Sequence, residues 1–145
     1  MKEKNKQQEK NNEASIKDQD TIIVSRKDII DIKDGLHKGR ICKVEINAYS
    51  EYEYIRVGIL PTDVTVPKDM DIPILKVGFP LNLTCKSSLG RLITNSGYDI
   101  TEKDDYTLKD LNDILVGKEI SFQTTTVTNE NGTFSNVIKD TIKFI

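Results

Sequence analysis

The chain has 145 residues, of which 37% are hydrophobic and 30% are charged, and its net charge is −2. This length suits one domain with a buried core, and no apolar run approaches the roughly 18 residues that a membrane-spanning helix needs. The near-neutral charge argues against non-specific binding of duplex DNA, which relies on phosphate contacts. It leaves open a local groove that stacks the bases of a single strand.

Residues 1–20 are dominated by Lys, Glu, Asp, Gln and Asn and contain almost no apolar side chains. Such a segment cannot bury enough surface to offset its ordering entropy, so we expect a disordered tail, with a charge-mixed amphipathic helix as the alternative. It has no apolar core of a secretory signal, and we expect a cytoplasmic protein. The folded domain is predicted over residues 21–145.

The first half of the domain predicts three strands. Residues 22–24 are β-branched and favour a strand, whereas residues 33–40 carry two glycines and predict a loop. Residues 41–48 alternate and predict a half-buried strand, followed by residues 52–60 as its hairpin partner. The apolar face predicted for residues 41–48 consists of Cys42, Val44, Ile46 and Ala48.

The second half begins with a proline-rich segment, residues 61–73, which predicts a long loop. Residues 74–83 then predict a strand that turns Leu75, Val77 and Phe79 to one side. The period changes at residues 87–97, where Ser87 is the expected N-cap of a helix and Gly97 its C′ residue.

A shorter helix is predicted from Thr107, with Asp110 completing a capping box and Gly117 ending the helix. Residues 118–127 and 133–145 predict a terminal hairpin around an Asn-Gly turn. Several strands with one helix before the last hairpin best fit a mostly β fold, a small OB-fold-like barrel with its helix between strands three and four. An α+β sandwich is the alternative.

A family resemblance rests on three stretches: ILKVGFPLNLTCKSSLGRLITNSG at 74–97, LNDILVGKEISF at 111–122 and NGTF at 131–134. In this layout a strand leads to an S-x-L-G-x-L helix, and L-x-G-K opens the last hairpin. It resembles small phage and mobile-element proteins that bind single-stranded DNA through an OB-fold, and it covers roughly residues 36–145. The shared residues are packing and capping residues, and the chain departs from the pattern in having no tryptophan and only 6% aromatic residues.

The stretch EYEYIRVGIL at 51–60 is the leading candidate for a binding surface. Residues two apart on a strand share a face, so Tyr52, Tyr54 and Arg56 are predicted to point the same way. Tyrosines that stack on bases, beside cations that neutralise phosphates, are typical of single-strand binding. The alternative is that both tyrosines are ordinary cross-strand pairs. The predicted nucleic-acid site consists of Arg40, Lys43, Tyr52, Tyr54, Arg56 and Lys76.

Other patterns carry less chemistry. The cysteines, Cys42 and Cys85, are predicted to be buried as small hydrophobic residues, and His37 has no evident acid–base partner. The acidic window at 99–113 favours a solvated surface over a docking site, and the hydroxyl-rich tip at 124–133 is either a ligand-gripping loop or a plain hairpin. No metal, cofactor or enzymatic activity is predicted.

Two functions are weighed. The first is a module that binds single-stranded DNA, or RNA, during replication or recombination. The alternative is a protein-interaction or structural module without a nucleic-acid ligand, with a protein partner or a second copy of the chain.

Overall fold

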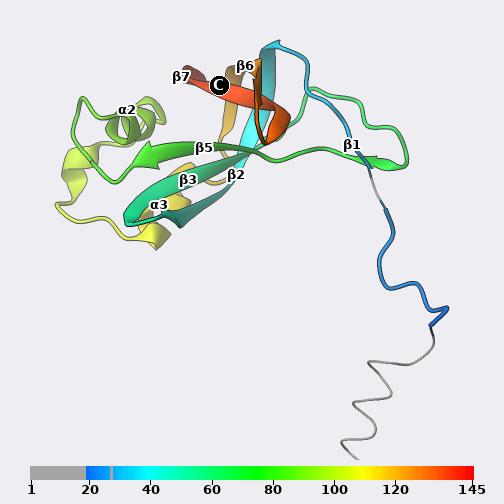
Figure 1. Ribbon diagram of the computed structural model, residues 1–145. Coiled ribbons are helices and arrows are strands. Elements are labelled where there is room, and N and C mark those ends of the chain that lie inside the picture. The colour runs from blue at the N-terminus through cyan, green and yellow to red at the C-terminus, as the bar shows by residue number, and fades with distance from the viewer. Residues whose placement is uncertain (1–18, 27) are drawn as a thin grey trace, which may run out of the picture.

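The protein is described by a computed structural model that covers residues 19–26 and 28–145. The predicted tail, residues 1–20, therefore lies outside the described residues except for its last two positions. The fold is mostly β (Figure 1). Its elements are β1 (Asp28–Ile29), β2 (Gly35–Tyr49), β3 (Tyr52–Pro61), β4 (Met70–Asp71), β5 (Leu75–Pro80), α2 (Ser88–Asn95), a 3-10 turn (Ile100–Glu102), α3 (Leu108–Leu115), β6 (Glu119–Asn129) and β7 (Gly132–Phe144).

Five strands form one antiparallel sheet in the order β5-β3-β2-β6-β7. The long strand β2 is shared, because its first part pairs with β6 and its remainder pairs with β3. The edge strands β5 and β7 contact each other, yet among the described residues no ladder of hydrogen bonds joins them. The sheet is therefore curled, but it does not close into a barrel.

Gly39 explains why β2 begins at Gly35 and replaces much of the loop predicted over residues 33–40. A Cβ atom at position 39 would lie 2.8 Å from the carbonyl oxygen of Leu60 and 2.9 Å from the ring of Phe122. Those residues belong to β3 and β6, so the three strands converge here only because position 39 has no side chain. The glycine marks a close approach of strands and not a turn, which is why the loop prediction is wrong.

A β-bulge at Cys42 corrects the apolar face predicted for β2. Ile41 pairs with Ile59, but Lys43 already pairs with Gly58, so Cys42 is an extra residue in the ladder. Strict alternation fails at this point: Ile41 and Val44 are buried, whereas Ile46 and Ala48 are exposed and Cys42 is only partly buried. The inserted residue puts Ile41 in place of Cys42 on the core side. Ile46 and Ala48 remain on the side of Val44 but lie toward the exposed tip of the hairpin.

The strand predicted at residues 22–24 is not formed. Ile22, Ile23 and Val24 have no regular structure and are 79–90% exposed, because no other described segment covers them. The chain first pairs at β1, whose two residues lie parallel to β4 within the proline-rich segment. The first residue of the core is Ile32.

Helix α2 begins where the sequence predicts it. The Ser87 hydroxyl accepts a hydrogen bond from the backbone N–H of Gly90 at 3.0 Å, and Gly97 follows the helix with a φ of +98°. The helix buries Leu89, Leu92 and Ile93. It packs against β5 and β7 and so lies over the edge strands of the sheet.

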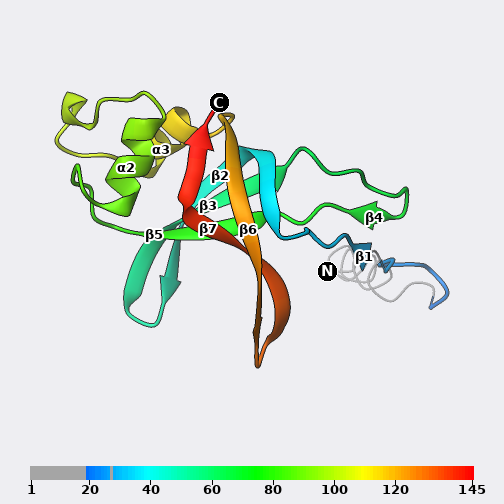
Figure 2. The same ribbon diagram turned by 90° about the horizontal axis from the view of Figure 1, so that it is seen from above.

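Helix α3 also follows its prediction. Thr107 and Asp110 form a reciprocal capping box, and Gly117 lies beyond the end of the helix with a φ of +93°. The side-chain amide of Asn112 donates to the carbonyl of Val44 at 3.1 Å and ties the helix to β2. Both helices lie between β5 and β6 in the chain and gather at one end of the molecule, away from β1 and β4 (Figures 1 and 2).

The predicted terminal hairpin of β6 and β7 is confirmed, with Asn129 paired to Gly132 across the turn. In Figure 2 this hairpin and the β2–β3 hairpin project toward the same side of the molecule. The expected strand over residues 74–83 is shorter, but its buried side is as predicted. Within the described residues neither helix is long and apolar enough to cross a membrane.

Candidate functional site

The register places the six predicted site residues on one face of the β5-β3-β2 part of the sheet. Residues directly opposite each other in antiparallel strands point to the same side. The opposed pairs are Arg40 with Leu60, Lys43 with Gly58, Asn47 with Tyr54, Tyr49 with Tyr52, Arg56 with Gly78, Tyr54 with Pro80, and Gly58 with Lys76. The other face of β3 carries Ile55, Val57 and Ile59, which are buried in the core.

Tyr54 is fixed from three directions. Its hydroxyl oxygen accepts hydrogen bonds from the side-chain amide of Asn47 at 3.1 Å and from the guanidinium of Arg56 at 3.2 Å. Its ring lies against Gly78, where an added Cβ atom would lie 3.2 Å from the ring. A ring held this firmly loses little conformational entropy when a ligand covers it.

The tyrosine cleft is an open hollow of about 360 Å³ beside Tyr54. Tyr49 and Tyr52 approach it from the tip of the β2–β3 hairpin and are 77% and 74% exposed. The lining is mainly apolar, with one cationic side chain from β7. The cleft is lined by Tyr49, Tyr52, Tyr54, Gly78, Phe79, Pro80 and Lys139.

The predicted cations are not all free. Glu45 lies between two of them, 3.7 Å from the ammonium of Lys43 and 3.9 Å from the guanidinium of Arg56. Arg40 stands opposite Glu119 in the ladder with β6. Lys76 is exposed on β5. Because exposed ion pairs contribute little, these side chains can exchange a carboxylate for a phosphate at small cost.

Of the predicted site residues only Tyr52 and Tyr54 line the cleft, and the prediction misses its other lining residues, among them Tyr49 and Lys139. Tyr49 pairs with Tyr52 across a turn in which Ser50 has a φ of +60°. The spacing Tyr-Ser-Glu-Tyr, a two-residue turn between tyrosines, is the signal that could have revealed Tyr49. Lys139 reaches the cleft through an irregularity of β7 that carries no comparable sequence signal.

His37 has a carboxylate neighbour, Asp63, that was not evident from the sequence. Its Nε2 lies 2.6 Å from the carbonyl oxygen of Lys33 and its Nδ1 lies 3.3 Å from the carboxylate of Asp63. The ring also lies 6.0 Å from that of Phe122 at the margin of the core. The imidazole therefore ties the segment before β2 to the loop after β3.

The cysteines and acidic residues form no metal site among the residues that the structure describes. Cys85 is exposed and Cys42 is partly buried, so the prediction that both are buried is wrong. Cys42 is the extra residue of the β2 bulge, and Cys85 lies in the loop before α2. Neither position belongs to the core, although free cysteine is usually buried.

The hydroxyl groups of the β6–β7 hairpin hold the segment that leads into β2. Thr124 and Ser135 donate to the carbonyl oxygens of Lys33 and Ile32, at 2.9 and 3.0 Å. Thr126 donates to the carboxylate of Asp34 at 2.7 Å. The inward hydroxyls of this hairpin therefore have structural partners.

The acidic window around α3 is organised by a cap. The pKa of Asp110 is lowered to about 2 because its carboxylate accepts hydrogen bonds from the Lys103 ammonium and then from the backbone N–H of Thr107. Lys109 pairs with Asp113 one turn further along the helix. These carboxylates are used by the helix itself.

Comparison with protein-family models and with curated proteins finds no match for this chain.

Proposed function

We propose that the protein is a non-enzymatic, cytoplasmic module that binds single-stranded DNA and supports replication or recombination of a phage or mobile element. The observation that carries the proposal is the tyrosine cleft, in which three tyrosines of one hairpin meet Lys139 of β7. Four further cations, Arg40, Lys43, Arg56 and Lys76, lie outside the cleft on the same face of the sheet. Bases of any sequence can stack on such rings, and the neighbouring cations neutralise phosphates.

The proposed fold is a partly open OB-type barrel. In support, the sheet order β5-β3-β2-β6-β7 brings the last strand back into contact with β5, and the helices come between β5 and β6. OB-folds bind oligonucleotides on the face of their second and third strands, between the first and last hairpins. Here those strands are β3 and β5, which hold Tyr54 and Pro80 of the cleft.

In the proposed complex the three tyrosines have different tasks. Tyr54 is a rigid platform, because Arg56 and Asn47 hold its hydroxyl group and Gly78 supports its ring. Tyr49 and Tyr52 are exposed and close over the bases from the hairpin tip. Arg40, Lys43 and Lys76 contact phosphates along the same face.

The test is fluorescence anisotropy with labelled oligo-dT at low salt, using Tyr52→Ala and Tyr54→Ala. A stacked base contributes about 1–3 kcal/mol, so each variant should weaken binding between about fivefold and about 150-fold. Tyr52→Phe is the matched control, because it keeps the ring and should bind like the wild type. Absence of binding by the wild type, or equal affinities for the Ala and Phe variants, would refute the proposal. Oligo-U in a parallel titration distinguishes RNA from DNA.

A second candidate function is a protein-interaction module, and one observation favours it. Ile22, Ile23 and Val24 form an exposed apolar segment of high β propensity before β1. Such a segment suits pairing with another chain. Size-exclusion chromatography with light scattering would support this candidate if the wild type forms an oligomer that Ile23→Asp dissolves while oligo-dT does not bind.

A further inference from the structure

An irregular bulge in β7 sets the position of Lys139. Ile138 pairs with Gln123 and Lys143 pairs with Ser121, so the four residues 139–142 stand opposite a single residue of β6. The hydroxyl of Thr141 stabilises the bulge, because it accepts from the backbone N–H of Gln123 at 2.8 Å and donates to the carbonyl of Ile138 at 2.6 Å. Bulges of this kind redirect side chains beside binding sites.

The bulge brings the ammonium group of Lys139 over the ring of Phe79, 4.9 Å from its centroid. Lys139 lines the tyrosine cleft and also a smaller neighbouring cavity. Within the described part of the chain its ammonium has no carboxylate partner. Lys139 is therefore a cation that packs on an aromatic ring and lies between the tyrosine cleft and the smaller cavity, where β5 meets β7.

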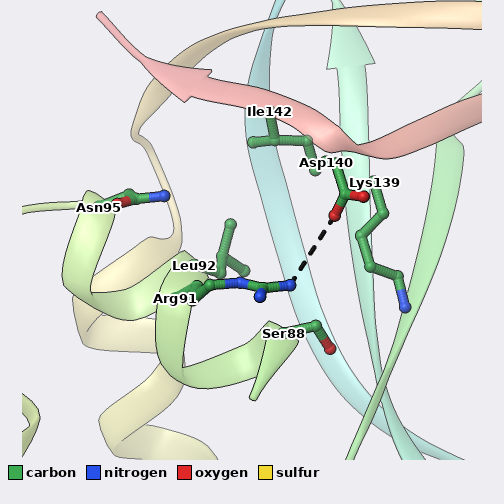
Figure 3. Close-up of a pocket in the computed structure, with 7 residues that line it drawn as sticks. All are labelled: Ser88, Arg91, Leu92, Asn95, Lys139, Asp140 and Ile142. Carbon is green, nitrogen blue, oxygen red and sulfur yellow. Dashed lines mark ion pairs between the residues drawn. The ribbon is translucent and has the colours of Figure 1, made fainter. Parts of the chain in front are cut away.

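The helix cavity is that smaller hollow, about 70 Å³ between α2 and β7, lined by Ser88, Arg91, Leu92, Asn95, Lys139, Asp140 and Ile142 (Figure 3). Figure 3 shows Arg91 reaching from α2 toward Asp140, with Lys139 extending in another direction beside it. The Arg91 and Asp140 side chains are 3.8 Å apart and are 56% and 87% exposed. A pair so exposed is weak and yields readily to a stronger anion.

We infer that Lys139 and Arg91 form a phosphate path by which a single strand leaves the tyrosine cleft, crosses the edge of β5 and reaches α2. The inference rests on the proposed function and extends its site beyond the face of the sheet. Lys139 contacts the phosphate next to the stacked bases. Arg91 exchanges Asp140 for the following phosphate, and its planar guanidinium can bind two phosphate oxygens at once.

The salt dependence of oligo-dT binding tests this path. Each phosphate contact on a single strand adds about 0.7 to the slope of log affinity against log salt. Lys139→Gln and Arg91→Gln should therefore each lower the slope by about 0.7 between about 50 and about 200 mM salt. Lys143→Gln is the matched control: it removes the same charge from the same strand, but Lys143 lines neither hollow and the slope should not change.

Asp140→Asn supplies a variant whose effect cannot come from damage to the fold. Removing the carboxylate frees Arg91 and takes a negative charge from the path, so affinity should rise roughly threefold at low salt. Weaker or unchanged binding by this variant would contradict the path.

The outcomes separate the two proposals. If the wild type binds and the tyrosine variants weaken binding, but Lys139→Gln and Arg91→Gln keep the wild-type slope, the path is refuted and the proposed function stands. If Lys139→Gln and Lys143→Gln lower the salt slope equally, the path is refuted as well, because only the overall charge would then matter. A wild type that binds no oligo-dT refutes both.

Discussion

At the scale of single residues, Tyr54 shows how ordinary strand chemistry fixes a side chain of the proposed binding surface. Alternation alone places it beside Tyr52 and Arg56, but its fixed position depends on partners from three strands. Asn47 comes from β2, Arg56 from β3 itself and Gly78 from β5. The glycine matters because a Cβ atom at position 78 would lie only 3.2 Å from the ring and would push it from this position.

Asp110 gives a prediction about pH at the same scale. Its pKa is lowered from 3.8 to about 2 by the hydrogen bond from Lys103, followed by that from Thr107. A lowered folded-state pKa means that this carboxylate stabilises the fold fully above pH 3.8, and that the contribution is lost as the pH falls toward about 2. Asp110→Asn keeps an acceptor for Thr107 and removes the titration.

Urea denaturation followed by circular dichroism across that pH range measures the effect. The midpoint of the wild type should fall more steeply with acid than that of Asp110→Asn. Parallel pH profiles for the two proteins would show that protonation of Asp110 does not contribute to the loss of stability in acid.

At the scale of elements, irregularities of the strands build the site. The extra residue Cys42 in β2 places Lys43 opposite Gly58, on the same face as Tyr54. The bulge of β7 brings Lys139 to the cleft. A regular sheet with the same sequence would distribute these side chains differently, because the side-chain period of a strand is two residues.

Thr141 is the residue on which the β7 bulge depends. Thr141→Val keeps the shape of the side chain but removes the hydroxyl, so the N–H of Gln123 and the carbonyl of Ile138 lose their partner. Because water can reach both groups, we expect a loss of about 0.5–1.5 kcal/mol in the free energy of unfolding, measured by urea denaturation. Thr141→Ser retains the hydroxyl and is the control; if it destabilises as much as Val, the hydrogen bonds do not hold the bulge.

The elements differ in how far the sequence predicts them. Both helices are found from local signals, since Ser87 and Thr107 cap their own first turns and need no distant partner. The start of β2 is missed because Gly39 acts through Leu60 and Phe122, which are far away in the chain. The strand predicted at residues 22–24 is wrong because β propensity alone forms no strand, and none of the described segments pairs with these residues.

At the scale of the whole molecule, the net charge of −2 says little about the proposed binding face. The six predicted residues share one side of the sheet because the register of β2, β3 and β5 aligns them, and alternation in β3 was enough to predict three of them. Lys139 was beyond reach of the sequence, since it enters the cleft through the return of β7 to β5. The local sequence pattern therefore predicts which residues of β3 share a face, whereas the contribution of β7 follows only from the topology of the sheet.

The central claim, that single strands bind in the tyrosine cleft, is tested most directly by an NMR titration of the ¹⁵N-labelled protein with oligo-dT. We expect the largest amide shifts at Tyr52, Tyr54 and Gly78, with smaller shifts at Lys139. The exposed residues Leu36 and Ile138, which pair with Gln123 outside the cleft, should not shift. Shifts confined to Leu36, Ile138 and their neighbours outside the cleft, or no shifts at saturating oligonucleotide, would contradict the claim.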